Sequence, residues 1–230
     1  MDAPATFWRR YAAYSVDVAA VVVIAVPLLA WQMAGVPAAF DAAVEALQLR
    51  LWDLLDGALM DPAGPLELAR RWADDPGLRA GIAALADVVL DAVVVAMLVL
   101  VLVAAVWFVG FESSARQATP GKAALGLRVT DADGGRAPFG RVLARFLAGA
   151  PSWALLHLGH AMAAWTRDRR ALHDLVAGTR VELRDDVAAA LPGWARAWLA
   201  LQVAAVVLLF GLVLVRYVQL ALEVAAGGLG

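Results

Sequence analysis

One acidic residue lies inside the first apolar stretch of the chain, residues 9–20, which read RRYAAYSVDVAA. Asp17 follows Arg10 by seven residues, so in a helix the two share a face but lie two turns apart, about 10 Å along the axis. An ionised carboxylate at membrane depth costs about 2.5–3.5 kcal/mol even on the mildest scale, so Asp17 needs a partner or water. Two roles remain open for it: a site for a cation or proton, or a structural ion pair with a basic residue such as Arg145 or Arg141.

A second acidic pair, Asp87 and Asp91, precedes the next long apolar run. Residues four apart share one face of a helix, and two neighbouring carboxylates can bind a cation or share a proton. Acidic residues are also favoured near a helix N-terminus, where they interact with the helix dipole. Both interpretations stay open from the sequence.

The histidines form a third group of candidates. His157 and His160 are three residues apart in an apolar segment, and His173 directly precedes Asp174. A metal site needs further ligands, and the segment around His157 and His160 contains no carboxylate, so we predict no metal and no cofactor. The alternatives are a polar lining that responds to pH and ordinary hydrogen-bonded structural residues.

Signatures of enzymes are missing from the sequence. The stretch ATPGKAALG (118–126) fails as a phosphate-binding loop because residue 116 is arginine where glycine is needed and Ala123 replaces the Ser or Thr after the lysine. We therefore interpret Pro120-Gly121 as a turn and Lys122 as an interfacial anchor. The chain has no cysteine, no serine nucleophile elbow and no H-E-x-x-H helix, so we expect no enzymatic activity.

The composition indicates an integral membrane protein. Hydrophobic residues make up 63% of the 230 residues and charged residues 17%, whereas ordinary globular chains have about 45–50% and about 25%. The net charge of −2 provides no basic field for nucleic acid. The apolar run after Arg10 exceeds the ~7–15 residues of a signal-peptide core, so we expect a retained helix.

The fold class predicted is an all-α integral membrane protein with three or four transmembrane helices. Three segments satisfy the requirement of ~20 mostly apolar residues, at about 11–34, 87–111 and 197–219. The fourth segment, 146–166, is uncharged but contains glycine, proline and histidine. It either spans or forms a broken re-entrant hairpin, which is tolerated only where protein or water satisfies the backbone.

Positive charge suggests the orientation. Residues 112–145 and 166–196 each contain six Lys or Arg, and basic loops stay cytoplasmic. A segment 146–166 that enters and returns keeps both loops inside, which we favour over a four-span topology. We therefore predict the bacterial inner membrane, a multi-pass chain with a cytoplasmic N-terminus, and an external insert at 35–85.

Two smaller elements complete the expected fold. The insert shows helical spacing of apolar residues over 39–60, then a break at DPAGP and a short helix to about Ala73. On the cytoplasmic side, residues 125–140 alternate and contain an Asp-Gly-Gly turn signal, and 178–183 alternate in the same way, which predicts a small antiparallel element of two or three strands.

Three motifs in this order resemble the RDD family of bacterial membrane proteins: RYAAYSVD, then ATPGKAALGLRVTDADGGR, then RRALHDLVAGTRV. The resemblance covers about residues 7–184, so 185–230 is expected to be an additional C-terminal transmembrane helix. It implies that Arg10, Asp17 and Asp174 are the family's arginine and two aspartates. HDLVAGT suggests a short helix ended by Gly178, with Asp174 paired structurally to an arginine such as Arg170 or Arg128.

The resemblance also implies a function, the transport of a small ligand, with cation/proton exchange at Asp17 as one form. The alternative is a non-catalytic membrane scaffold or subunit in which the Arg and Asp residues form structural ion pairs. The expected partners are the lipid bilayer, small cations or protons, and a second copy or a membrane partner protein. The free-energy cost of burying the Asp17 carboxylate at membrane depth is compatible with either function.

Overall fold

The computed structural model describes residues 4–60, 63–154 and 157–225. The chain divides into two compact units. Unit 1 comprises Met1–Val18 and Trp107–Gly230, and unit 2 comprises Ala19–Val106. Each unit is described by itself.

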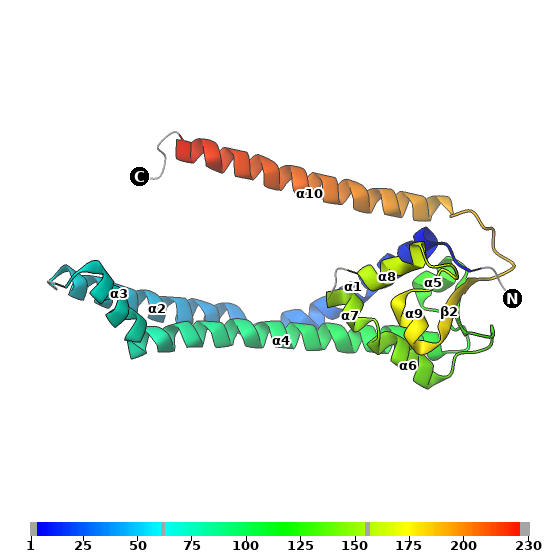
Figure 1. The fold of residues 1–230 in the computed structure, drawn as a ribbon, viewed down its shortest axis with the longest axis horizontal. Coiled ribbons are helices and arrows are strands. Elements are labelled where there is room, and N and C mark those ends of the chain that lie inside the picture. Colours follow the sequence, from blue (N-terminus) through cyan, green and yellow to red (C-terminus); the bar gives the residue numbers. More distant parts are fainter. Residues whose placement is uncertain (1–3, 61–62, 155–156, 226–230) are drawn as a thin grey trace. The chain divides into compact units, whose positions relative to one another are not determined.

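Three long apolar helices confirm the three predicted spans (Figure 1). They are α1 (Phe7–Gln32), α4 (Pro76–Ser113) and α10 (Gly193–Ala225), and each is long and apolar enough to cross a membrane. Every one begins before the apolar run predicted from the sequence. Hydropathy detects the part of a helix that suits lipid, whereas the backbone hydrogen bonds continue into the flanking polar turns.

The segment 146–166 forms short pieces instead of a fourth long helix. Its described residues contain α7 (Ala150–Ala154), α8 (Leu158–Ala161) and a 3-10 turn, Met162–Ala164, with His157 in the left-handed region at φ 63°. A fourth continuous span is therefore wrong for the described residues, and the broken segment is confirmed. Whether it re-enters a bilayer stays a prediction.

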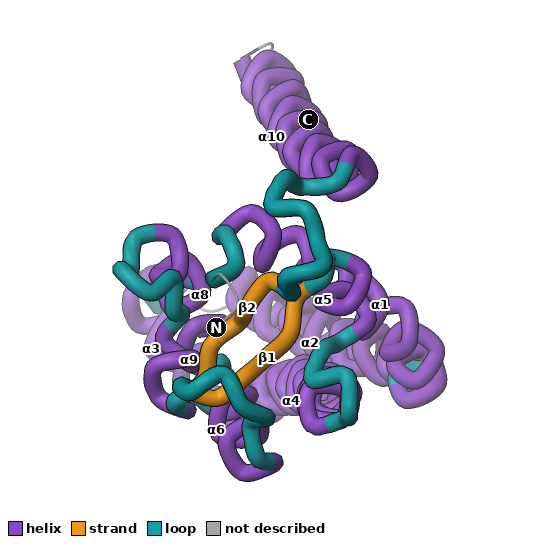
Figure 2. Tube along the Cα trace, turned by 90° about the vertical axis from the view of Figure 1, so that its right-hand side faces the viewer, coloured by secondary structure: helices purple, strands orange, loops and turns teal. Residues whose placement is uncertain are grey.

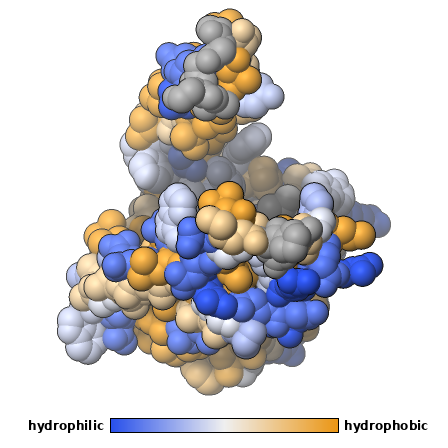
Figure 3. Space-filling view, turned by 90° about the vertical axis from the view of Figure 1, so that its left-hand side faces the viewer, coloured by the Kyte–Doolittle hydropathy of each residue, from blue (hydrophilic) through white to orange (hydrophobic). Residues whose placement is uncertain are grey.

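Unit 2 contains the two helices predicted for the insert, α2 (Val36–Leu59) and α3 (Pro65–Asp74). Arg50 of α2 donates from Nε to Asp75 Oδ1 at 2.9 Å, and the same carboxylate oxygen accepts from Leu78 N at 2.7 Å. The arginine and this backbone bond lower the pKa of Asp75 to about 2. Hydrophilic residues gather at the end of unit 2 where α3 lies (Figure 3).

A two-stranded sheet organises unit 1, as predicted (Figure 2). β1 (Leu127–Asp131) pairs antiparallel with β2 (Thr179–Leu183), and Val129 lies opposite Val181. Leu127, Val129 and Val181 of the strands are buried with Ala12 and Ala13 of α1 in one core, and Leu183 packs against it partly buried. The sheet thus joins the start of α1 to segments more than a hundred residues later.

Three short helices surround the sheet: α5 (Pro120–Ala124), α6 (Phe139–Leu147) and α9 (Leu172–Ala177) (Figure 2). The turn predicted at Pro120-Gly121 is wrong, because Thr119 caps a helix there by accepting from Lys122 N at 3.4 Å. The helix predicted before Gly178 is confirmed as α9. Gly178 ends it in the left-handed conformation at φ 63°, which glycine adopts without strain.

Candidate functional site: a charged cavity in unit 1

Asp17 is completely buried and holds α5 against α1. Its Oδ1 accepts from Gly121 N at 2.9 Å and from Trp107 Nε1 at 3.1 Å, and its Oδ2 accepts from Thr119 Oγ1 at 2.5 Å. A Cβ at position 121 would lie 2.8 Å from Oδ2, so only glycine permits this approach. An ion pair with an arginine was one of the two roles left open for Asp17, and among the described residues its partners are Thr119, Gly121 and Trp107 instead.

Asp174 is the carboxylate that meets arginines. It is fully buried and forms ion pairs with Arg10 of α1 and Arg145 of α6. It also accepts from Ala171 N at 2.9 Å, which caps the start of α9. The sequence therefore predicted a structural ion pair correctly but named the wrong arginines.

The two arginines predicted for Asp174 have other contacts. Arg170 donates to the backbone oxygens of Asp174 and Thr179, at 3.0 and 3.1 Å. Arg128 lies beside the buried carboxylate of Glu182, at 3.7 Å. Spacing along the chain did not identify the partners, because Arg10 and Asp174 are 164 residues apart.

A second buried carboxylate, Glu112 in the last turn of α4, extends the ion pairs. Lys122 of α5 donates to its Oε1, and Arg145 Nε lies 3.2 Å from its Oε2. Lys122 is only 7% exposed, so its predicted role as an interfacial anchor is wrong. Glu112 was not among the predicted site residues, although it directly follows an uncharged run (92–111) and so stands out as a charge at the end of a span.

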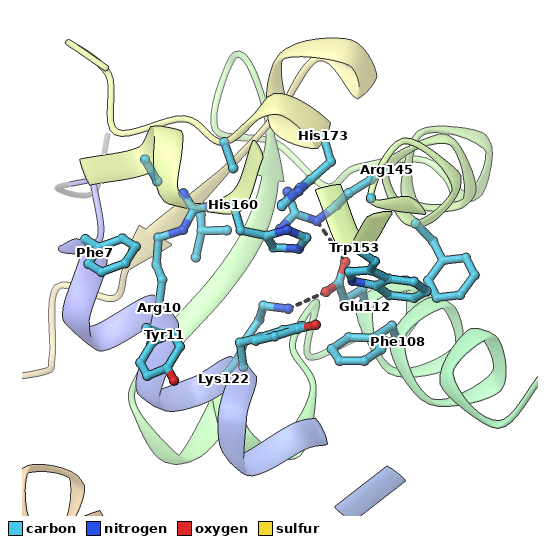
Figure 4. Close-up of a pocket in the computed structure, with 16 residues that line it drawn as sticks. Phe7, Arg10, Tyr11, Phe108, Glu112, Lys122, Arg145, Trp153, His160 and His173 are labelled. Carbon is cyan, nitrogen blue, oxygen red and sulfur yellow. Dashed lines mark hydrogen bonds and ion pairs between the residues drawn. The ribbon is translucent and has the colours of Figure 1, made fainter. Parts of the chain in front are cut away.

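These charges line a cavity of about 100 Å³ (Figure 4). Its walls come from both segments of unit 1: α1 contributes Arg10 and Tyr14, and α4 contributes Phe108 and Glu112. Six aromatic side chains take part in the lining: Phe7, Tyr11, Tyr14, Phe108, Phe146 and Trp153. The cavity therefore combines a charged wall with a largely aromatic one, which is the usual character of a small-molecule site.

Two of the three predicted histidines line this cavity. The rings of His160 and His173 are 4.6 Å apart, and the ring of Tyr14 lies 5.3 Å from that of His160. Burial and the neighbouring His157 lower the pKa of His160 to about 3, and burial and Arg145 lower that of His173 well below its usual value. Both are therefore neutral at pH 7.

His157 is exposed and does not line the cavity, although its ring contacts Tyr14 at 5.8 Å. Burial disfavours the charged form of His160 and His173, and the positive charges of the neighbouring arginines disfavour it further. No group of three or more His, Asp or Glu suited to a metal occurs among the described residues.

The remaining acidic candidates, Asp87 and Asp91, lie in the part of α4 that belongs to unit 2, and both are exposed. Since α4 begins at Pro76, Asp87 lies about three turns into the helix. The explanation from the helix N-terminus is therefore wrong. Neither residue lines the cavity of unit 1.

Arg9 was also missed by sequence reasoning. It is 1% exposed, and its guanidinium donates to backbone oxygens of Leu125 and of Ala188 and Ala189 at 3.2, 2.7 and 3.3 Å. It thus ties the start of α1 to the connection before α10. The sequence marks the pair Arg9-Arg10 but does not say that each residue binds a different segment.

The profile of the RDD family matches residues 4–178. The chain belongs to the RDD family. An uncharacterized protein of Bacillus subtilis (strain 168), YxaI, is 31% identical over 85 residues, which are 37% of this chain and 56% of YxaI. The match thus spans little more than half the length of that relative, and no solved structure matches the chain.

The RDD match includes Arg10, Asp17 and Asp174 together with the cavity up to His173. It ends at Gly178, one residue before β2, whereas we predicted the resemblance to reach about residue 184. Helix α10 lies outside the match. The charged cavity is therefore built almost wholly from the RDD region of this membrane protein.

Proposed function

We propose that this RDD protein carries a small charged solute across the membrane and holds it in the cavity of unit 1. The observation that supports this is the convergence of charged side chains from two membrane-length helices, α1 and α4, on one cavity. Ionisable residues near membrane depth are costly and commonly mark a solute path. Aromatic and charged walls around one small space also suit solute binding.

Cation/proton exchange is one form of this function, and the geometry favours a different residue for it than Asp17. Three donors occupy the Asp17 carboxylate, and Asp17 does not line the cavity. Glu112 does line it and contacts Lys122 and Arg145. In this proposal the solute meets Glu112 and its partners, while Asp17 and Asp174 hold the walls in place.

A second candidate function is a non-catalytic membrane scaffold or subunit. It is favoured by the chain of ion pairs Arg10–Asp174–Arg145–Glu112–Lys122, which connects α1, α9, α6, α4 and α5. In that case the charges serve assembly alone. The chain then acts through a second copy or a membrane partner protein.

Reconstitution separates the two candidates. The purified full chain is placed in liposomes that contain a pH-sensitive dye, and Na⁺, K⁺ or small anions are added outside. We expect protein-dependent flux of at least one of these solutes. Folded protein with no flux of any, together with a reproducible co-purifying membrane protein, would favour the scaffold.

We further propose a location in the bacterial cytoplasmic membrane with the N-terminus inside, supported by the basic residues of 112–145. The chain has no cysteine, so single cysteines can report the orientation. In intact cells, a membrane-impermeant maleimide should label Gly64→Cys and spare Arg116→Cys. The opposite labelling would overturn the orientation.

A further inference from the structure

We propose that the unit 1 cavity recognises a small organic carboxylate, whose charge lies among the cations and whose apolar body lies against the aromatic wall. The proposal rests on the proposed solute role of the cavity and names the class of solute. It follows from three features that are independent of one another: the balance of charge, two unpartnered imidazole atoms, and the aromatic lining.

The charge balance favours an anion. Arg10, Lys122 and Arg145 line the cavity, and Glu112 is the carboxylate of the lining. Asp174, fully buried behind it, pairs with both arginines. Three cations against two carboxylates leave one positive charge in a nearly buried cluster, which repels a further cation and is neutralised by a single carboxylate.

Hydrogen-bond donors remain for such a group. A lysine ammonium has three hydrogens, and Glu112 accepts one of those of Lys122. The Lys122 Nζ also lies 5.3 Å from the ring centroid of Phe108, so the ammonium is oriented at the border of the aromatic wall. A carboxylate at this border would accept a charge-assisted hydrogen bond.

The histidines provide the second feature. His173 is only 6% exposed, and its Nδ1 has no hydrogen-bond partner in the described part of the chain. The same holds for Nδ1 of His160, whose ring lies between Arg10 and Arg145 in Figure 4. A neutral imidazole can donate through Nδ1, and a buried donor without an acceptor costs free energy. The oxygens of a bound carboxylate would supply the missing acceptors.

The aromatic wall and the volume indicate an organic anion of few atoms. Tyr14 and Phe108 lie nearly parallel, with ring centroids 6.0 Å apart, and the ring of Trp153 meets that of Phe146 edge-on at 5.7 Å. An engineered apolar cavity of about 150 Å³ holds benzene, so about 100 Å³ suits a slightly smaller body. A short aliphatic monocarboxylate fits this space better than an inorganic anion, which would leave the aromatic faces without contacts.

Such a carboxylate has two sources, a soluble metabolite or the head of a fatty acid from the bilayer. Isothermal titration calorimetry on the purified full chain in a neutral detergent distinguishes them, with butyrate and laurate as the two probes. Inorganic phosphate, butyramide and butylammonium serve as the matched anion, neutral and cationic probes. We expect butyrate to bind, butyramide to bind at least about tenfold more weakly, and butylammonium not to bind.

The result with laurate decides the source, because tighter binding of laurate than of butyrate would assign the site to a lipid-derived acid. Binding of the amide or the ammonium as tight as that of both acids would overturn the proposal. So would phosphate binding without either carboxylate, or no binding of any probe.

Two variants test the residues. Lys122→Met removes the ammonium with its remaining donors and also its ion pair with Glu112, whereas His160→Phe removes an imidazole and leaves every ion pair of the cluster intact. Each should weaken butyrate binding by about tenfold or more, the size of one hydrogen bond to a charged group, and exposed Arg116→Met should not. If Lys122→Met does not fold, His160→Phe still decides, and unchanged binding in His160→Phe would refute the site.

The two levels of the proposal fail separately. Carboxylate binding without flux in liposomes would refute transport and keep the solute class. Flux of Na⁺ or K⁺ in a protein that binds no carboxylate would refute the solute class and keep transport.

Discussion

Replacing Asp17 with alanine tests whether this carboxylate is an anchor or a titrating site. The change leaves the hydroxyl of Thr119, the N–H of Gly121 and the indole N–H of Trp107 without their common acceptor. We expect the folded protein to lose stability. Asp17→Asn should lose less, because the amide keeps one oxygen for Gly121 and its NH₂ group can donate to the threonine oxygen.

The magnitude follows from the donors. Each buried donor left without a partner costs about 1–3 kcal/mol. Part of the total for the three donors is offset, because Asp17→Ala also removes a charge that is costly to bury. For Asp17→Ala we expect about 2–5 kcal/mol, which is a large part of the 5–15 kcal/mol typical of a folded domain. At about 2–4 °C per kcal/mol for a chain of this size, the Tm should fall by about 5–15 °C.

The assay is thermal unfolding in detergent, followed by the fluorescence of the nine tryptophans. Asp87→Ala is the matched control, because Asp87 is an exposed carboxylate on another long helix, and its Tm should change little. Equal Tm values for Asp17→Ala and Asp87→Ala would refute the anchor. Loss of solute flux in Asp17→Asn at an unchanged Tm would also refute the anchoring role of Asp17 and would indicate a titrating site.

Three further perturbations test the cluster around the cavity. In a double-mutant cycle, Arg10→Gln and Asp174→Asn should show a coupling energy of about 1–3 kcal/mol, because the two buried groups pair directly. From pH 7 to pH 5 the natural chain should lose about 1–2 kcal/mol more stability than His160→Phe. His160 has a pKa near 6.5 in the unfolded chain, whereas burial, with His157 beside it, holds its pKa at about 3 in the folded chain. Between pH 7 and pH 5 only the unfolded chain takes up this proton, and so the folded chain loses stability. Gly121→Ala should lower the Tm by several degrees, because its Cβ would collide with Asp17.

Each of these has a control within the chain. The exposed pair Arg184–Asp186 should show coupling close to zero in the same cycle, and equal coupling in both cycles would contradict a buried Arg10–Asp174 pair. The pH effect is contradicted if His160→Phe and the natural chain lose stability in parallel. A Cβ at Gly110 meets nothing within 4 Å, so Gly110→Ala inside α4 should not lower the Tm, and an equal fall there would refute the argument for Gly121.

Much of the fold was predictable because membrane spans and strand alternation are local patterns. The three spans follow from long runs of apolar residues, and the helices of the insert and the two strands follow from periodicity within short windows. The ends of the spans did not follow, since α4 continues through polar turns back to Pro76. The broken segment 146–166 was recognised by its glycines and proline, which disfavour a continuous helix.

The site was less predictable, because its contacts join residues far apart in the chain. The motif residues Arg10, Asp17 and Asp174 were identified, but the partner of each was not. Lys122 was predicted to be an interfacial anchor because its partner, Glu112, comes from another helix. A single sequence reveals that a buried charge needs a partner, and only the fold reveals which one.

The most direct test of the account compares solute flux in liposomes for His160→Phe and Asp17→Asn at equal amounts of folded protein. His160 lines the cavity, whereas Asp17 does not line it and holds α5 against α1. The account predicts that the butyrate flux above that of protein-free liposomes falls about tenfold in His160→Phe and is retained in Asp17→Asn. Flux that persists in His160→Phe and disappears in Asp17→Asn would contradict it.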